Sequence, residues 1–331
     1  MVRREVDVPT LVQRARGGEA RSVARLISLV EDASPRLREV SALLVGHAGR
    51  AHVVGITGSP GVGKSTTTSA LVTRMRRRGH RVGVLAVDPT SPFSGGALLG
   101  DRVRMQEHAT DVDVYIRSMA TRGHLGGLSW AVPQAVRVLD AAGCDVVVVE
   151  TVGVGQSEVD VAGLADTTIV LLAPGMGDGI QAAKAGVLEI GDLFVVNKAD
   201  RDGADQVARD LRSMVSRTDA GAWRRPVLKA VASSGEGVDE VAAAVEEHRE
   251  HLASTGALAE RRRRRARDEI ETIAVTGLRE SLADVGGDAR LDGLADDVLA
   301  GRTDPYRAAD ALLERAVGGG APASAPGRPG L

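Results

Sequence analysis

The sequence predicts an α/β protein organised around a mostly parallel β-sheet, and we expect it to be soluble and cytoplasmic. From residue 51 onwards, short β-branched runs alternate with stretches of helical periodicity. The runs are almost continuously apolar, as in DVVVVE at residues 145–150, which is typical of strands buried on both faces of a parallel sheet. Apolar residues make up 43% of the chain and aromatic residues only 2%, so the core must be mainly aliphatic.

Length, charge and cysteine content exclude several classes of function. With 331 residues, the chain is long enough for two domains or for one large domain with appendages. Its 42 basic and 44 acidic residues nearly cancel, so no global field favours nucleic acid or a membrane surface. Cys144 is the only cysteine, which excludes an intramolecular disulfide and cysteine-cluster metal sites. The first ten residues lack the apolar stretch of a signal peptide, and no run of about 18 apolar residues could span a bilayer.

Residues 1–50 are predicted to form an N-terminal helical segment. Val23, Leu26, Ile27 and Val30 fall at i, i+3, i+4 and i+7, which gives one apolar stripe on a helix. The pair Ser34-Pro35 predicts an N-cap followed by proline at the first position of the next helix.

Residues 51–255 are predicted to form the α/β domain. Its expected strands are His52–Thr57, Arg81–Val87, Val112–Arg117, Asp145–Glu150, Thr168–Ala173, Leu193–Val196 and Pro226–Ala230. A helix near Val238–Leu252 is expected to end the domain.

Residues 256–317 are predicted to form a separate helical arm. Five arginines, Arg261–Arg265, precede apolar residues at helical spacing, namely Ile270, Ile273, Leu278 and Leu282. Because an arm has little of its own chain to pack against, this stripe predicts contact with a partner subunit. Residues 318–331 are rich in glycine, proline and alanine, and we expect them to be disordered.

A glycine-rich segment after the first expected strand has the sequence and context of a Walker A phosphate-binding loop. Its candidate nucleotide-binding residues are Gly58, Ser59, Pro60, Gly61, Val62, Gly63, Lys64, Ser65 and Thr66. The glycines let backbone N–H groups point at phosphate oxygens, and the helix N-terminus that follows favours negative charge. Lys64 would reach the β- and γ-phosphates, and the Ser65 hydroxyl would ligate Mg²⁺. The chain contains only four lysines, which makes a chance match improbable.

The sequence NKAD, at the end of the strand Leu193–Val196, predicts recognition of guanine. The carboxylate of Asp200 can accept hydrogen bonds from N1–H and the 2-amino group of guanine, whereas adenine offers no such donors at that edge. Asn197 and Lys198 complete the motif. Val231, Ala232 and Ser233 follow the last expected strand, where backbone N–H groups could close over the base.

Acidic residues at strand ends are candidates for Mg²⁺ binding and for positioning the attacking water. Glu150 ends the strand DVVVV at the Walker B position, and Gly153 allows a backbone N–H to approach the γ-phosphate. Asp88 ends the strand after the phosphate loop, and Asp101 lies further along a loop. Ligands of such sheets bind at this carboxyl edge. Asp88 and Asp101 could instead be helix N-caps.

Two glycine-rich stretches, residues 118–128 and 174–179, are candidate switch segments that a γ-phosphate would order. Lys184 or Arg122 could supply positive charge to the transition state once a partner orders its loop. The alternative is that both simply cap local helices.

Taken together, these motifs resemble the MeaB/ArgK family of GTPases, which are associated with adenosylcobalamin-dependent methylmalonyl-CoA mutase and include the human methylmalonic aciduria type A protein. The strings that carry the resemblance are GSPGVGKST, DPTSP, GDRVRM, RSMATRGHLGGLS, ETVGVGQSE, PGMGDGIQAAKAG and VVNKAD, in order from about residue 35 to 285.

The resemblance implies a SIMIBI-class P-loop domain with an N-terminal helical segment and a C-terminal dimerisation arm. It also implies a G-protein chaperone that couples GTP hydrolysis to loading and protecting the mutase's B12 cofactor. The PGMGDGIQAAKAG stretch would be a switch that responds to the mutase, which makes Lys184 a candidate catalytic residue beside Lys64 and Glu150.

Two other functions compete with this interpretation. A nickel-insertion GTPase would need a cysteine- and histidine-rich metal store, and the sequence has one cysteine and no histidine tract. A kinase of a transport protein or small molecule would need an acceptor pocket with a catalytic base, which the motifs do not suggest. A SIMIBI partition ATPase is disfavoured because Ser59 and Pro60 occupy the stretch where its extra lysine would lie.

Overall fold

The computed structural model describes residues 7–88, 105–120, 131–151, 157–175, 188–218 and 223–318. The chain divides into two compact units, residues 1–261 and residues 262–331. In the first unit, the strands are β1 (His52–Thr57), β2 (Val82–Asp88), β3 (Val114–Ala120), β4 (Val146–Thr151), β5 (Thr167–Leu172), β6 (Leu193–Val196) and β7 (Val227–Lys229). Its helices are α1 (Val8–Arg16), α2 (Ala20–Glu31), α3 (Leu37–Leu44), α4 (Lys64–Arg77), η1 (Gln106–His108), α6 (Ala131–Ala141), α7 (Ser157–Leu164), α9 (Leu188–Ile190), α10 (Ala204–Thr218) and α11 (Val238–Ser254).

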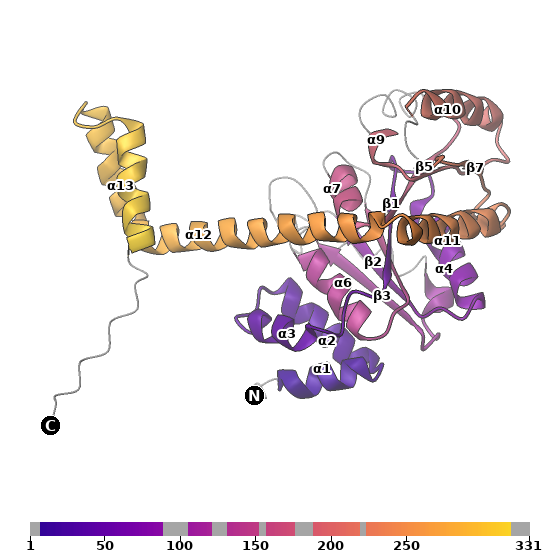
Figure 1. Cartoon of the computed structure of the whole chain (residues 1–331), viewed down its shortest axis with the longest axis horizontal. Coiled ribbons are helices and arrows are strands. Elements are labelled where there is room, and N and C mark those ends of the chain that lie inside the picture. The colour runs from indigo at the N-terminus through magenta and orange to yellow at the C-terminus, as the bar shows by residue number, and fades with distance from the viewer. Residues whose placement is uncertain are drawn as a thin grey trace. The chain divides into compact units, whose positions relative to one another are not determined.

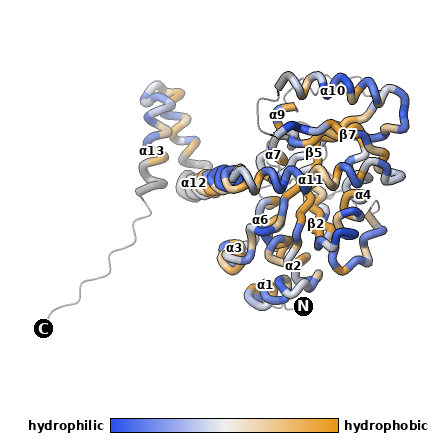
Figure 2. Tube along the Cα trace, turned by 45° about the vertical axis from the view of Figure 1, so that its right-hand side comes forward, coloured by the Kyte–Doolittle hydropathy of each residue, from blue (hydrophilic) through white to orange (hydrophobic). Residues whose placement is uncertain are grey.

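The seven strands form one sheet in the order β3-β2-β4-β1-β5-β6-β7, and each neighbouring pair is parallel. Helices cover both faces of the sheet (Figure 1). The apolar residues of Figure 2 concentrate on the strands. This arrangement confirms the predicted α/β class with a parallel sheet, because strands buried on both faces carry continuous rather than alternating apolar runs.

Alternate side chains of each strand enter two different layers of the core. In β4, Val147 and Val149 pack with α6 and the N-terminal helices, whereas Val146 and Val148 pack with α4 and α11. A third cluster joins α10 to β5 and β6 around Phe194. The sheet is therefore held from both sides, and its carboxyl edge is fixed in position.

The N-terminal helices α1–α3 bury one apolar face each. Val23, Leu26, Ile27 and Val30 of α2 are all buried, which confirms the predicted stripe. The next helix begins later than the sequence suggests, because Ser34 and Pro35 form a turn before it. The backbone N–H of Leu37 donates to the Ser34 carbonyl at 2.9 Å, and α3 starts there.

A polar network closes the amino edge of the sheet. The Thr167 hydroxyl lies 2.8 Å from His52 Nε2 and 2.8 Å from His248 Nδ1. Arg261 donates two hydrogen bonds to the carboxylate of Asp192, at 2.7 and 2.9 Å. Burial lowers the pKa of His248 to about 4 despite the nearby carboxylate of Asp192. The network therefore holds a neutral imidazole at physiological pH and pins Arg261 to the start of β6.

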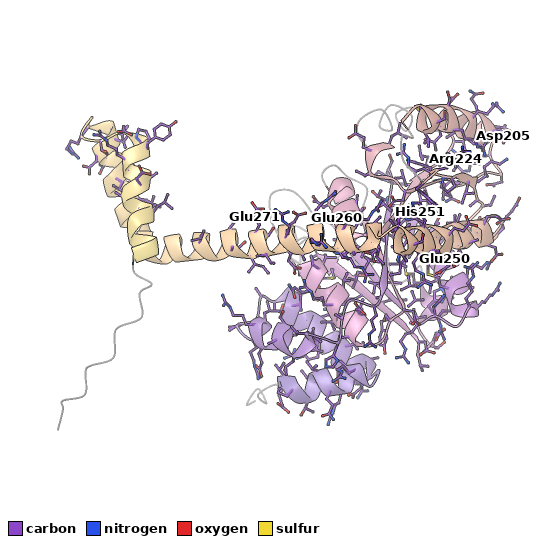
Figure 3. The ribbon with its side chains drawn as sticks, in the orientation of Figure 1. Asp205, Arg224, Glu250, His251, Glu260 and Glu271 are labelled. Atoms are coloured by element: carbon purple, nitrogen blue, oxygen red, sulfur yellow. The ribbon has the colours of Figure 1, made fainter. Side chains whose placement is uncertain are left out.

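Helix α12 (Ala257–Leu299) begins in the first unit, and its residues from 262 onwards belong to the second unit. The second unit also contains α13 (Pro305–Gly318). Glu260 and Glu271 both lie on α12 (Figure 3). Helix α13 begins in the way its sequence favours, with Pro305 at the first position and Asp304 before it. The Asp304 carboxylate accepts the backbone N–H groups of Tyr306 and Arg307, each at 3.0 Å.

Candidate nucleotide-binding site

The predicted phosphate loop connects the end of β1 to the start of α4. Gly58 and Gly63 have φ angles of 142° and 95°, in the region that favours glycine. A Cβ atom on Gly58 would lie 2.3 Å from the carbonyl oxygen of Leu171, and one on Gly63 would lie 2.4 Å from the side-chain nitrogen of Asn197. The loop therefore passes so close to β5 and to the NKAD segment that no side chain fits at either position.

Lys64 is the first residue of α4 and its side chain folds back over the loop. Its Nζ atom donates to the carbonyl oxygens of Gly58 at 2.9 Å and Ser59 at 3.1 Å, and the residue is buried. An ammonium group held in this position, beside a helix N-terminus, provides the positive charge that a bound phosphate chain requires.

Glu150, the penultimate residue of β4, lies beside the first turns of α4. The Ser65 hydroxyl donates to Glu150 Oε1 at 2.6 Å, and the Thr68 hydroxyl donates to Oε2 at 2.9 Å. All three residues are buried. A hydroxyl and a carboxylate that are already oriented by the fold are the hard oxygen ligands that Mg²⁺ prefers, so these residues fit that ion.

The NKAD segment ties three loops of the site together. Asn197 donates from Nδ2 to the carbonyl oxygen of Val62 at 2.8 Å, and its Oδ1 accepts the backbone N–H of Ala232 at 3.0 Å. Lys198 donates from Nζ to the carbonyl oxygen of Gly61 at 2.6 Å and has a positive φ of 56°. Asp200 remains exposed on the same segment. Its carboxylate is therefore accessible to a ligand.

The loop after β7 lies against this segment. Val231 and Ala232 are buried, and Ser233 is exposed. The backbone N–H of Val231 donates to the carbonyl oxygen of Glu236 at 2.9 Å, which closes a short turn. Because Asn197 bonds to both this turn and the phosphate loop, the structure brings residues 58–66, 197–200 and 231–233 into one assembly.

The described residues contain most of the predicted site. Asp88 is the last residue of β2, and the register of β2 with β4 places it at the same edge of the sheet as Glu150. Asp101, Gly153, Lys184 and Arg122 lie outside the described residues. Thr66 is exposed on the first turn of α4, next to Ser65.

Sequence reasoning missed Thr68 and the structural part played by Asn197. Asn197 could have been found, because an amide that ends a buried strand has two donors and an acceptor to satisfy. Thr68 gave no signal, since it stands in a run of three threonines at the start of a helix. Its partner lies 82 residues further along the chain.

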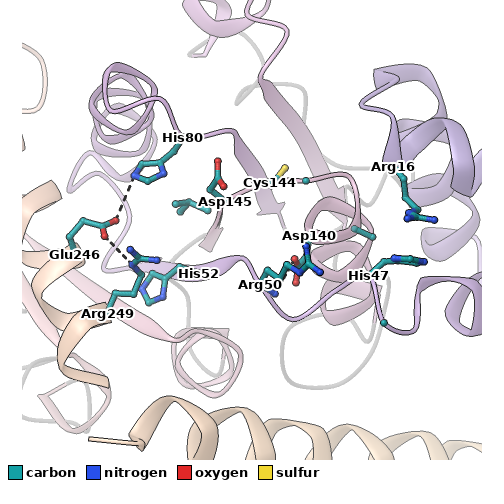
Figure 4. A pocket seen from close by; sticks show the side chains of 14 residues that line it. Arg16, His47, Arg50, His52, His80, Asp140, Cys144, Asp145, Glu246 and Arg249 are labelled. Carbon is teal, nitrogen blue, oxygen red and sulfur yellow. Dashed lines mark hydrogen bonds and ion pairs between the residues drawn. The ribbon is translucent and has the colours of Figure 1, made fainter. Parts of the chain in front are cut away.

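A cavity lies at the opposite, amino edge of the sheet (Figure 4). It has a volume of about 700 Å³, and among its lining residues are Arg16, His80, Asp140 and Glu246. Helices α1, α4 and α6 end near it, so their negative dipole ends disfavour a phosphate there. Glu246 is paired with Arg249 at 2.9 Å. The carboxyl edge, where a helix begins behind a glycine loop, is therefore the candidate nucleotide site.

Comparison with known proteins agrees with this assignment. A family described as "Methylmalonyl Co-A mutase-associated GTPase MeaB" matches residues 23–285. A putative GTPase of Pyrococcus horikoshii is 47% identical over 317 residues, which cover 94% of this chain and 99% of the relative. GTPase ArgK of Escherichia coli is 38% identical over 263 residues, covering 77% and 80% of the two chains. The mouse methylmalonic aciduria type A homolog, described as mitochondrial, is 34% identical over 317 residues, covering 90% and 76%.

A solved structure described as an LAO/AO transport system kinase has a similar fold. It matches with a TM-score of 0.67 and 28% sequence identity, and the match covers 95% of this chain and 99% of that one. The predicted P-loop α/β fold and the predicted GTPase activity are both confirmed. With a glycine loop, a buried lysine and an NKAD segment joined at one sheet edge, and with a family match over most of its length, this chain belongs to the MeaB family of GTPases.

Proposed function

We propose that this chain is a G-protein chaperone for an adenosylcobalamin-dependent acyl-CoA mutase. In this role it couples GTP binding and hydrolysis to loading or protecting the mutase's B12 cofactor, with methylmalonyl-CoA mutase as the expected client. The observation that carries the proposal is the family match over residues 23–285, because that family is described as mutase-associated. The resemblance of the mouse relative, which is described by a methylmalonic aciduria type, supports the same client.

The described residues suggest how the nucleotide is held. Lys64 and the backbone of residues 58–66 bind the phosphates, and Ser65 and Glu150 hold Mg²⁺ together with Asp88 and Asp101. The bound ion would neutralise charge on the phosphate oxygens. Asp200 pairs with the guanine base, while Asn197 and Lys198 hold the surrounding loops through their contacts with Val62 and Gly61.

Two further elements of the proposal concern the response to the mutase. The backbone N–H of Gly153 approaches the γ-phosphate, and Lys184 supplies positive charge to the transition state once the mutase orders its segment. Intrinsic hydrolysis is then slow, and the mutase accelerates it. The B12 cofactor itself remains bound to the mutase.

We also propose that the protein is a homodimer formed through its C-terminal arm. On α12, Ile270, Ile273 and Leu278 are 68%, 55% and 51% exposed, which leaves an apolar stripe that a second subunit would cover. Among the helices of the described residues, none is long and apolar enough to cross a membrane. A cytoplasmic location, and the lack of nucleic-acid and membrane partners, remain predictions from the sequence.

The test is GTP hydrolysis by the purified protein, alone and with the mutase from the same organism, with ATP as the control nucleotide. A rise of about tenfold or more with GTP only, equal to about 1.4 kcal/mol of transition-state stabilisation, supports a mutase-gated chaperone. Loading of adenosylcobalamin into the apo-mutase should depend on GTP in the same mixture. An unchanged rate with no complex between the two proteins contradicts the proposed client.

The description of the similar solved structure makes a transport-protein kinase the second candidate. Incubation with GTP labelled at the γ-phosphate separates the two functions. Label recovered only as inorganic phosphate supports the GTPase chaperone, whereas label transferred to a protein or metabolite supports the kinase.

A further inference from the structure

The hydroxyls of Thr67, Thr68 and Thr73 on helix α4 have two kinds of partner. Thr67 donates to the carbonyl oxygen of Gly63 at 3.0 Å, and Thr73 donates to that of Ser69 at 3.1 Å, both one turn back along the helix. Such bonds are the ordinary local solution for a threonine in a helix. Thr68 differs, because its hydroxyl crosses from α4 to β4 and donates to Glu150 Oε2 at 2.9 Å.

This contact completes the pairing of a buried carboxylate. Thr68 is fully buried and Glu150 is 6% exposed. Ser65, one turn earlier on the same face of α4, donates to the other oxygen, Oε1, at 2.6 Å. Two hydroxyls spaced three residues apart therefore hold both oxygens of one carboxylate, which fixes the plane of the carboxyl group relative to the helix.

The orientation of Glu150 decides where the Ser65 proton points. A serine hydroxyl has one proton and two lone pairs. While Glu150 accepts that proton, the lone pairs of Ser65 are directed away from Glu150, as a cation ligand requires. If the carboxylate rotates, Ser65 loses this acceptor and the direction of its lone pairs changes.

We propose that Thr68 is a positioning residue for Mg²⁺, which it serves without touching the ion by locking Glu150 and, through it, Ser65. The inference deepens the proposed nucleotide site and rests on it. Removing the hydroxyl leaves Glu150 Oε2 buried without this donor, which disfavours the oriented, charged carboxylate. Removal of the Thr68 hydroxyl should therefore weaken the binding of Mg²⁺. It should leave the binding of nucleotide in the absence of Mg²⁺ unchanged.

The experiment titrates Mg²⁺ into metal-stripped protein that carries a fluorescent GDP analogue, and records the Mg²⁺ concentration at half-saturation. Thr68→Val keeps the shape of the side chain and removes the hydroxyl. We expect the half-saturating Mg²⁺ concentration to rise about tenfold, which corresponds to about 1.4 kcal/mol. Binding of the analogue in EDTA should stay within about twofold of the wild type.

Two further variants separate positioning from packing. Thr68→Ser restores the hydroxyl and should return the Mg²⁺ response to within about twofold of the wild type. Thr73→Val removes a hydroxyl from the same helix that bonds only locally and to His108, at 3.5 Å, so its Mg²⁺ response should match the wild type. If Thr68→Val does not fold, as judged by its thermal unfolding, Thr68→Ala is smaller and takes its place.

The outcomes distinguish this inference from the proposed function. A folded Thr68→Val protein with the Mg²⁺ response of the wild type overturns the positioning role, as does a failure of Thr68→Ser to restore the response. A wild type that binds the GDP analogue with no dependence on Mg²⁺ overturns the magnesium assignment itself, and the inference falls with it.

Discussion

At the scale of single residues, Lys64 is the most consequential side chain of the site. It is buried and bonded to two carbonyl oxygens of its own loop. Lys64→Ala removes the only described charge inside that loop, so GTP hydrolysis should fall below detection in a phosphate-release assay. Lys229→Ala is the matched control, because Lys229 is exposed and its ammonium is paired with Asp205 at 2.8 Å and not with the phosphate loop. Normal turnover by Lys64→Ala would remove the loop from the mechanism.

We expect Asp200 to carry the selectivity for guanine. Asp200→Ala should reduce the preference for GTP over ATP by about 100-fold, because two hydrogen bonds to a carboxylate are lost with guanine and none with adenine. Competition between GTP and ATP for binding measures this ratio. Asp202→Ala, an exposed aspartate two residues on, should keep the wild-type ratio. An unchanged ratio in Asp200→Ala would show that the base contacts another group.

Individual residues differ in how far the sequence predicts their roles. Lys64 and Asp200 are candidates from the sequence alone, because each belongs to a motif whose chemistry demands that residue type at that spacing, and their roles stay predictions. Thr68 and Asn197 act through contacts with residues 82 and 135 positions away, and such distances depend on the strand order. Local periodicity carries no information about that order, so these partners appear only in the fold.

At the scale of elements, the junction of β1 with the phosphate loop should be sensitive to any added carbon. Gly58→Ala would place Cβ 2.3 Å from the carbonyl oxygen of Leu171 on a central strand, which cannot move cheaply. Gly79→Ala is the control, because Gly79 also has a positive φ, of 86°, but no atom within 4 Å of the added Cβ. We expect Gly58→Ala to be less stable than Gly79→Ala by about 2 kcal/mol in urea unfolding. Equal stability of the two variants would contradict the close approach.

Helix α11 should make the fold sensitive to acid through His248. Burial lowers its pKa to about 4, against about 6.5 in the unfolded chain. Between these values the unfolded chain binds a proton that the folded chain does not, so stability falls as the pH is lowered from about 6.5 to about 4. His248→Gln has no such proton, so its midpoint of thermal unfolding should fall less over this range. A pH dependence identical to the wild type would exclude His248 as the cause.

The strands were predicted more accurately than the helix boundaries. An aliphatic run such as DVVVVE is buried on both faces only when its strand lies between two layers of the fold. Strands β1, β4 and β6 accordingly follow their predicted ranges to within one residue. The start of α3 was misplaced because serine before proline favours a turn as well as a cap. Helix α12 continues through Gly286 and Gly287, where propensity alone would favour an end.

At the scale of the whole molecule, the exposed stripe of α12 leads to a prediction about assembly. Ile273→Glu puts a charge in the middle of the stripe, so the proposed dimer should dissociate to monomer at micromolar concentration in analytical ultracentrifugation. Glu271→Gln alters a neighbouring exposed position of the same helix and should leave the dimer intact. A wild type that sediments as a monomer would contradict the dimer proposal.

The buried thiol of Cys144 has a practical consequence. It is 3% exposed, and burial raises its pKa to about 12, so it is almost entirely protonated at neutral pH and reacts slowly with alkylating probes. Since it is the only cysteine in the chain, a cysteine introduced on an exposed position of α12 could be labelled selectively without first removing the native one. Spin labels or fluorophores, one on each subunit of the proposed dimer, would then report the distance between the two C-terminal arms with GTP and with GDP. The rest of the sequence would remain unaltered.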